Sequence, residues 1–460
     1  MTVKNQVAAG RAARKRAPLE AHAGWQPPRG RPDPIRLLEK QAETRIPDLV
    51  PIRYGRMLTS PFAFYRGAAV IMARDLAGTP DSGFRAQLCG DAHVSNFGGF
   101  ASAERTLVFD INDFDETLPG PWEWDLKRLA ASLEIAGREY GLPKKKRRKL
   151  VRSSVDEYQS AMHDFAGHGH MEVWYEQLDV DNLSRRWGDR LSGRARKNLA
   201  EAPTLAKDNQ RALEKLTRRQ AGGKIRFAGN PPLVQRIADL VTDDQARRLE
   251  HEMHGYLDAY GQSLADDRRA ILRRFTYTDL ARKVVGVGSV GTRTNIILML
   301  GRDASDPLVL QVKEATASVL EPYVGRSVYR RQHGRRIVEG QRLIQASHDV
   351  LLGWVRGLGI DGVMHEYYVR QLWDWKVALE PSRMKPGGLR VLGQACAWTL
   401  ARAHARTGDR VAISAYLDGG TGFSGAIDEF AVAYADQNER DYAALADAVE
   451  KGRITAQTGI

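Results

Sequence analysis

The alternation of apolar and polar residues predicts long amphipathic helices over much of the chain. Between residues 151 and 165 apolar side chains recur at spacings of four and three, which puts them on one helix face. That face comprises Val151, Val155, Tyr158, Met162 and Phe165. Pro143 stands at a first-turn position and is expected to begin this helix. The segment PWEWDLKRLAASLEIAG, residues 121–137, is predicted to form the preceding helix.

Two further regions have helical patterns. Residues 33–77 are predicted to be helical, with an interruption at RYGRMLTSPFAFYRG. After Pro386 the chain becomes helical again, and one face of that helix carries Leu389, Leu392, Cys396, Leu400 and Ala403. Residues 1–30 are instead basic and rich in Gly, Ala and Pro, so we expect a flexible basic tail there.

A block before Pro386 has the texture of β-structure. Its strand-like segments are bounded by turn residues, and they read VVGVGSVG, NIILML, PLVLQVKEA, VLLGWV and HEYYVRQL. One helical stretch, VYRRQHGRRIVEGQRLIQASH, interrupts them. Because this block stands between helical segments, the pattern predicts an α+β protein.

Composition narrows the class of protein. The chain has 460 residues, of which 69 are basic and 56 acidic. A net charge of +13 is typical of proteins with anionic partners, and the alternative is an Arg-rich composition with a solvated surface. No apolar run reaches the roughly eighteen residues that a membrane helix needs, and the N-terminus has no apolar signal core. We therefore expect a cytoplasmic protein without a membrane partner. The two cysteines exclude a disulfide framework and a thiolate zinc site.

Several acidic residues stand close together in CGDAHVSNFGGF (89–100) and VFDINDFDE (108–116). Asp91 and Asn96 lie in a predicted loop, and a strand and then Asp113 follow. An Asn and an Asp beside phosphates can hold Mg²⁺, and a second Asp can orient the proton of an acceptor. The alternative is that these acids form turns and helix caps. Their position between apolar strand residues (LVFDINDF) favours a site, because burying an unpaired charge is costly.

A glycine-rich segment, VVGVGSVGTRTNIILML, contains Gly286, Gly288 and Gly291 in the pattern GxGxxG. A dinucleotide-binding fold would need a helix after the glycines and an acid about twenty residues later, whereas the following NIILML is strand-like. A glycine-rich hairpin lying over phosphates fits this order better. A tight turn between two strands is the alternative.

Lys313 stands near the end of the apolar strand PLVLQVKEA, on the same face as Val309 and Gln311. A lysine in this position can extend into solvent, or it can pair with the phosphates of a nucleotide. The helix that follows carries Glu339, a candidate ion-pair partner for Lys313.

Taken together, these segments resemble the protein kinase-like fold. The glycine hairpin, strand lysine and helix glutamate resemble its small lobe, and GDAHVSN resembles the catalytic-loop pattern HGDxHxxN of the aminoglycoside and choline phosphotransferases. DFDE, with Asp125 and Leu126 downstream, resembles the metal-binding segment of that branch. LARAHA (401–406) resembles the end of the helix that normally precedes the catalytic loop. Cys89 stands where that pattern often has His.

The order of these segments differs from that of ordinary members. Here the catalytic loop near residue 90 precedes the small lobe near residues 285–375, so the order looks circularly permuted, with the break between LARAHA and GDAH. The motifs SPFAFYRG, GDAHxxNFG, NDFDET and RQLWDWK also closely resemble an uncharacterised bacterial family, domain of unknown function twenty-two fifty-two, over residues 35–440.

The kinase-like resemblance implies a two-lobed α+β architecture with ATP and Mg²⁺ as cofactors. A large helical lobe with the catalytic and metal-binding loops would span residues 31–280, a small β-rich nucleotide-binding lobe 281–378, and helices completing the large lobe 379–460. The implied roles are catalysis for Asp91; metal binding for Asn96 and Asp113, with Asp110 as a rival ligand; a phosphate loop of Gly286, Gly288, Ser289 and Gly291; phosphate pairing for Lys313 with Glu339; and contact with adenine for Gln371 and Trp373.

We therefore expect an ATP- and Mg²⁺-dependent phosphotransferase that acts on an unidentified hydroxyl or amine of a small molecule or protein; nucleotidyl transfer is a variant of the same site. One of Arg53, Arg56 and Arg66 would point at the phosphates or an anionic substrate, or else pair with one of the acids. The alternative function is a non-catalytic module that binds nucleotide or nucleic acid on the same scaffold. KKKRRK (144–149) supports an acidic partner, because the helix dipole disfavours cations in a first turn.

Overall fold

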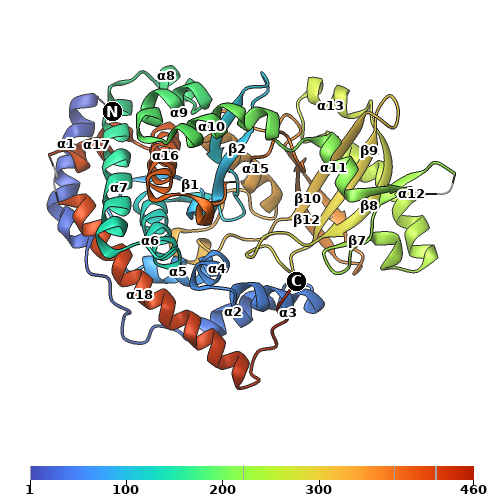
Figure 1. Cartoon of the computed structure of the whole chain (residues 1–460), viewed down its shortest axis with the longest axis horizontal. Helices are drawn as coiled ribbons and strands as arrows, with labels where there is room; N and C mark the ends of the chain where they lie inside the picture. The colour runs from blue at the N-terminus through green and yellow to red at the C-terminus, as the bar shows by residue number, and fades with distance from the viewer. Residues whose placement is uncertain (1, 221, 378, 420–421) are drawn as a thin grey trace.

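The structure is a computed structural model that describes residues 2–220, 222–377, 379–419 and 422–460. The fold is mixed α and β. Figure 1 shows a part built from packed helices next to a part built around a β-sheet. In the described part of the chain, no helix is both long enough and apolar enough to cross a membrane.

Long helices form the core of the helical part. They are α6 (Glu123–Glu139), α7 (Lys144–Gly167), α16 (Pro386–Thr407), α17 (Arg410–Leu417) and α18 (Phe423–Glu450). The apolar faces predicted for α7 and α16 are confirmed, because their residues are buried in one hydrophobic cluster. Pro143 precedes α7 directly, as expected. Shorter helices α8 (His170–Tyr175), α9 (Val180–Trp187) and α10 (Gly193–Leu205) follow α7 along the chain.

The expected flexible tail at residues 1–30 is wrong for most of its length. Val3–Arg16 form helix α1, which packs along α17 (Figure 1). Small residues allow the close approach: Ala13 is fully buried, and a Cβ at Gly10 would overlap the backbone of α17. After α1, the buried His22 hydrogen-bonds to the hydroxyl of Tyr416 at 2.7 Å. The Gly and Ala residues of this N-terminal segment therefore allow α1 to pack closely against α17.

Residues 34–76 contain four short α-helices. These are α2 (Pro34–Ala42), α3 (Val50–Met57), α4 (Pro61–Gly67) and α5 (Ala69–Leu76). The segment that was expected to interrupt the helical pattern is itself largely helical, because Ser60 begins a new helix by accepting a hydrogen bond from the Ala63 amide. Two antiparallel ribbons follow: β1 (Arg85–Leu88) pairs with β4 (Leu118–Pro121), and β2 (Phe97–Ala101) pairs with β3 (Leu107–Ile111).

A six-stranded antiparallel sheet has the order β11-β12-β10-β9-β8-β7. Its strands are β7 (Val234–Arg236), β8 (Thr276–Lys283), β9 (Thr294–Leu300), β10 (Pro307–Glu314), β11 (Gly353–Leu358) and β12 (Met364–Gln371). VVGVGSVG was expected to be strand-like, but these residues form the turn between β8 and β9. The turn is followed by the predicted strands at NIILML and PLVLQVKEA, which are confirmed.

The sheet extends across the boundary expected between residues 280 and 281. Strand β7 and most of β8 precede that boundary. One face of the sheet packs against α12 (Asp243–Gly261) and α13 (Asp266–Leu272). The other face packs against α11 (Asn209–Leu216) and β6 (Ile225–Phe227), and β6 pairs with β5 (Thr217–Arg219). The sheet part therefore begins near residue 209, and its early strands were missed because TYTDLARK lacks an apolar alternation. Helices α14 (Glu321–Val324) and α15 (His333–Ile344) connect β10 to β11.

Candidate active site

Segments from both parts of the molecule line one cavity of about 450 Å³. The loop after β1 contributes Asp91 and Asn96, and the loop after β3 contributes Asp113. The turn between β8 and β9 contributes Gly286, Gly288 and Ser289. The structure therefore brings together acidic and glycine-rich segments that are about two hundred residues apart in the sequence.

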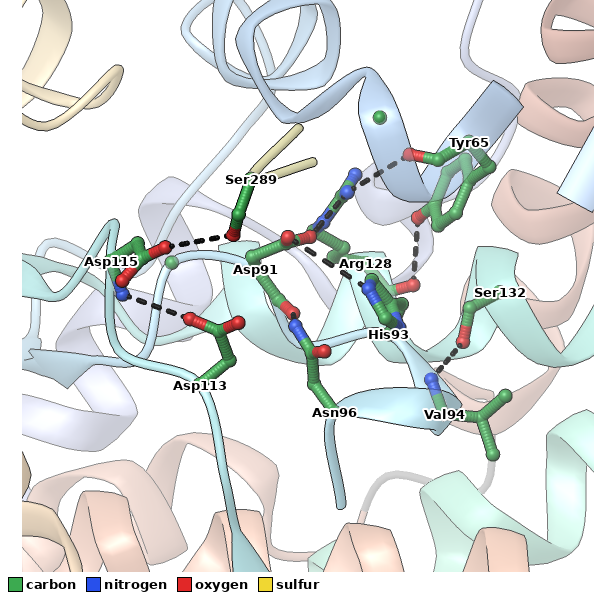
Figure 2. A network of polar contacts seen from close by, with 12 residues as sticks. Tyr65, Asp91, His93, Val94, Asn96, Asp113, Asp115, Arg128, Ser132 and Ser289 are labelled. Atoms are coloured by element: carbon green, nitrogen blue, oxygen red, sulfur yellow. Dashed lines mark hydrogen bonds and ion pairs between the residues drawn. The ribbon is translucent and has the colours of Figure 1, made fainter. Parts of the chain in front are cut away.

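The carboxylate of Asp91 is held by Arg128 of α6 (Figure 2). Arg128 Nε donates a hydrogen bond to Asp91 Oδ1 at 2.6 Å. The guanidinium lies 4.4 Å from the centroid of the Tyr65 ring and also donates to the Tyr65 carbonyl. Burial raises the pKa of Asp91 above its ordinary value of 3.8, although Arg128 acts in the opposite direction. A buried carboxylate with a raised pKa is suited to accept a proton.

The loop that carries Asp91 is fixed by backbone hydrogen bonds. The amides of Cys89 and Gly90 donate to the carboxylate of Asp125 at 2.8 and 3.0 Å. Gly90 has φ of +81°, and a Cβ there would meet the backbone of Glu116. Asn96 Nδ2 donates to the Asp91 carbonyl at 2.8 Å. The loop therefore presents the Asp91 side chain and the Asn96 amide to the cavity from a fixed backbone.

Lys313 of β10 reaches the acidic loop that follows β3. Its Nζ lies 2.7 Å from Asp115 Oδ2 and 3.8 Å from Asp113 Oδ2. Tyr368 donates to Asp115 Oδ1 at 2.7 Å, and Ser289 Oγ donates to Asp115 Oδ2 at 3.3 Å. Burial alone would raise the pKa of Asp115, but the Lys313 ammonium and the hydrogen bond from Tyr368 lower it below the ordinary value. Asp115 is thus a charged member of the site.

Sequence reasoning did not assign Asp115 to the site. The signal that could have found it is the spacing of DFDE, which places Asp115 two residues after Asp113 in a loop where the Asp115 amide donates to Asp113 Oδ1 at 3.2 Å. Figure 2 shows Asp113, Asp115 and Ser289 on the side of Asp91 that faces away from Arg128.

Glu339 does not pair with Lys313, contrary to expectation. It stands on the outer side of α15, where its carboxylate lies 3.9 Å from Arg335 and 3.5 Å from Arg342. The inner side of α15 presents Arg336, which donates hydrogen bonds to the carbonyls of Asp115 and Thr117. The position that sequence reasoning gave to Glu339 is therefore taken by Asp115 as the partner of Lys313.

Asp110 is not a rival metal ligand. Both of its carboxylate oxygens lie 2.8 Å from a terminal nitrogen of Arg402 on α16, and both side chains are buried. Asp110 does not line the cavity, whereas Asp113 does. The Asp110 carboxylate instead forms a buried ion pair with Arg402. A buried carboxylate needs such a cationic partner.

The glycine-rich turn is anchored to the helices that precede the site. Arg56 donates to the Gly286 carbonyl at 2.6 Å, and Arg45 donates to the Val290 carbonyl. Gly286 and Gly291 have φ of +61° and +89°, values that favour glycine. Gly291 does not line the cavity; its carbonyl accepts a hydrogen bond from the Ile46 amide at 2.8 Å.

Of the three arginines considered from the sequence, only Arg66 lines the cavity. Arg53 is fully buried and donates to Gln41 and to the Gly67 carbonyl. The cationic residues Lys40 and Arg45 join Arg66 in the lining. The cavity therefore has carboxylates and cations in its wall, a composition that suits a phosphate with a bound metal ion.

Glu116 is a further site residue that sequence reasoning missed. It lines the cavity, and its Oε2 accepts a hydrogen bond from the Val319 amide at 2.7 Å. Burial raises the pKa of Glu116 from 4.5 to about 7. It can therefore exchange a proton near neutral pH.

The two connector residues expected to meet adenine lie in different surroundings. Gln371 lines a polar cavity of about 60 Å³, where its Nε2 donates to Asp349 at 3.0 Å. Trp373 does not line that cavity; it packs against the cluster on the sheet face that α11 covers. Lys207 Nζ lies 5.5 Å from the centroid of the Trp373 ring.

The basic run at the start of α7 is paired in part with buried acids. Arg147 Nε lies 2.9 Å from Glu134, and the Nε atoms of Arg148 and Arg152 each lie 3.0 Å from Asp428. Internal ion pairs therefore explain part of this run. An acidic partner at these residues stays a prediction.

The sequence model of a family described as uncharacterized protein conserved in bacteria (DUF2252) matches residues 45–448. No curated protein matches the chain, and no solved structure matches it. The matched residues include both acidic loops, the glycine-rich turn and Lys313. The resemblance of the motifs to this uncharacterised bacterial family is thus confirmed, and the chain belongs to the family.

Proposed function

We propose that the chain is an ATP- and Mg²⁺-dependent phosphotransferase with a circularly permuted kinase-like fold. The observation that carries the proposal is the contact of Lys313 with Asp115 and Asp113 beside the glycine-rich turn. In kinase-like enzymes a glycine-rich turn, a strand lysine and metal-binding carboxylates meet around the nucleotide phosphates. Here the glycine-rich turn and the carboxylates line one cavity, and Lys313 lies behind its wall in contact with Asp115. These groups follow one another along the chain in a different order from that of ordinary kinase-like enzymes.

The donor set of the cavity suits Mg²⁺. Within the described ranges, no cluster of three or more His, Cys, Asp or Glu side chains is arranged as a metal site. Mg²⁺ in nucleotide sites usually takes one or two carboxylates and completes its shell with phosphate oxygens and water, so Asn96, Asp113 and Asp115 supply suitable oxygens. When bound there, Mg²⁺ would neutralise charge on the transferring phosphoryl group.

The remaining residues have roles that follow from their positions. Asp91, held by Arg128, would orient the acceptor and accept its proton. The backbone amides of Gly288 and Ser289 in the turn would cover the phosphates. Lys313 would hold Asp115 and approach the phosphates from the sheet. Catalysis would then rest on positioning and electrostatic stabilisation.

A thermal-shift titration with ATP and Mg²⁺ tests the proposal. A ligand at a hundred times its Kd stabilises the folded state by about 2.7 kcal/mol. We expect a metal-dependent shift for the wild type that Asp113→Asn loses, while the control Asp267→Asn, an exposed change on α13, keeps it. The absence of a shift with every nucleotide would exclude the proposed site.

Turnover separates the enzyme from a module that only binds. Release or transfer of radiolabelled γ-phosphate should occur with the wild type, and Asp91→Asn should reduce it at least a hundredfold while keeping the ATP-dependent shift. A shift without any turnover, even with a broad set of hydroxyl and amine acceptors, would instead favour nucleotide binding without catalysis.

A further inference from the structure

A second cavity, of about 270 Å³, lies between α12 and the six-stranded sheet. It shares no lining residue with the candidate active site. Leu358 and Ile360, 43% and 45% exposed, stand where it opens to solvent. Protein interiors are close-packed and rarely contain voids of this size, and an open apolar cavity is typical of a ligand site.

The roof of this second cavity is one face of α12. Its residues recur at helical spacing and present apolar or aromatic side chains to the sheet; they are Leu249, Met253, Tyr256, Leu257 and Tyr260. The Tyr260 hydroxyl donates to the Leu351 carbonyl, and the Tyr256 hydroxyl donates to Glu252 at 3.1 Å. Because both hydroxyls have protein partners, the roof offers mainly an apolar surface.

The floor changes from polar to apolar across the strands. Arg282 of β8 pairs in register with Asn295 of β9, Asn295 with Val312 of β10, and Val312 with Val369 of β12. Cross-strand partners in register share a sheet face, and all four residues line the cavity. A molecule that fits this floor has a polar group at one end and an apolar body.

The polar end of the floor carries a positive charge without a carboxylate partner. Arg282 donates to the amide oxygen of Gln235, but in the described part of the chain no acidic side chain lies within ion-pair distance of it, and its Nε has no hydrogen-bond partner. The charge of Asp48 acts on Arg282 from beyond that distance and does not offset burial, which lowers the pKa of Arg282. The side chain of Asn295 makes no hydrogen bond to any described residue. Arg293, the other cation in the lining, is already paired with Glu314 and Asp361. An anionic group would compensate Arg282, since a half-buried cation is stabilised by a charged partner.

We propose that the second cavity binds a small anionic amphiphile, a monocarboxylate with an apolar body. The carboxylate lies against Arg282 and Asn295, and the apolar body lies over Val312 and Val369 beneath α12. This site is independent of the proposed phosphotransferase function, because it uses other residues and another face of the sheet.

Isothermal titration calorimetry of the full chain with octanoate, octanol and octylammonium tests the proposal. Octanoate should bind at one saturable site, octanol more weakly, and octylammonium not at all. Arg282→Gln should weaken octanoate binding about tenfold and leave octanol binding unchanged, because a hydrogen bond to a charged group contributes about that much. Arg302→Gln, an exposed arginine in the turn after β9, is the matched control and should bind octanoate like the wild type.

Filling the cavity gives a second, independent test. Leu257→Trp places a larger side chain in the roof and should abolish octanoate binding. If that variant does not fold, the selective effect of Arg282→Gln decides. Asp113→Asn should bind octanoate normally, so failure of the proposed phosphotransferase site would be seen separately. Equal binding of all three probes, unchanged binding in both cavity variants, or no saturable binding by the wild type would overturn the proposal.

Discussion

Lys313 Nζ lies 2.7 Å from Asp115 Oδ2, although the two residues are 198 positions apart in the sequence. Lys313 belongs to the sheet, and Asp115 belongs to a loop between two ribbons of the helical part. The Tyr368 hydroxyl, from the neighbouring strand β12, donates to the other oxygen of Asp115. This contact therefore joins the two parts of the molecule at the wall of the candidate active site.

Removing the charge of Asp115 should destabilise the protein. Asp115→Asn leaves the Lys313 ammonium, whose side chain is only 3% exposed, with the more distant Asp113 as its remaining acid. We expect a loss of about 1 to 3 kcal/mol in the free energy of unfolding, measured by urea denaturation. Glu339→Gln is the matched control, and it should change stability by less than about 0.5 kcal/mol, because its ion pairs are partly exposed. A larger loss in the control than in Asp115→Asn would contradict the assignment.

Substitution of two neighbouring aspartates should affect different properties of the protein. Asp110→Asn breaks a buried pair with Arg402 and should lower the free energy of unfolding by about 3 kcal/mol. Asp113→Asn should have a much smaller effect on stability, because Asp113 is 32% exposed and 3.8 Å from Lys313, but it should remove the response to ATP and Mg²⁺. Chemical denaturation with and without ATP and Mg²⁺ measures both quantities. Equal effects of the two variants on stability would show that Asp110 is not a structural ion pair.

The sequence predicted helices and strands correctly where the spacing of apolar residues matches the buried face of the element. The faces of α7 and α16 and the strands β9, β10 and β12 could be predicted because their apolar residues repeat at the spacing of the element they form. The same pattern could not reveal β8, since TYTDLARK alternates polar residues with few apolar ones. Residues 276–283 form a strand because they pair with β9, and this pairing is not visible in their own sequence.

The partners of the charged residues could not be read from local sequence. Asp110 pairs with Arg402, which lies 292 positions away, and Lys313 pairs with Asp115 across 198 positions. Local pattern identified the acids, the glycine turn and the lysine as chemically interesting. Which acid meets which cation depends on how the two parts pack, and this is why Glu339 and Asp110 received the wrong roles.

Helix α1 should be a fixed part of the fold. Gly10→Val places a branched side chain against the backbone of α17, and overpacking of this kind costs about 1 to 3 kcal/mol. We expect trypsin to cleave the variant within residues 11–16 under conditions in which the wild type resists. Ala8→Val, at an exposed position of the same helix, is the control and should resist cleavage. Equally rapid cleavage of the wild type would show that α1 is detached in solution.

The pKa of Glu116 implies a pH dependence of stability with a definite sign. Burial raises this pKa from 4.5 to about 7, so the folded protein binds a proton that the unfolded chain has released. The contribution of Glu116 to stability is complete below pH 4.5 and is lost as the pH rises to about 7. Because the side chain is partly exposed, we expect the loss to be on the order of 2 kcal/mol.

Glu116→Gln keeps the shape of the side chain and removes its titration. The free energy of unfolding of the wild type minus that of the variant should therefore fall between pH 5 and pH 7.5, as measured by urea denaturation across that range. Glu123, whose pKa is also raised to about 7, contributes equally to both proteins and cancels in the difference. Glu104→Gln, at an exposed position, should give a curve parallel to that of the wild type. A difference that stays constant or increases with pH would mean that Glu116 is already ionised in the folded protein and does not exchange a proton near neutrality.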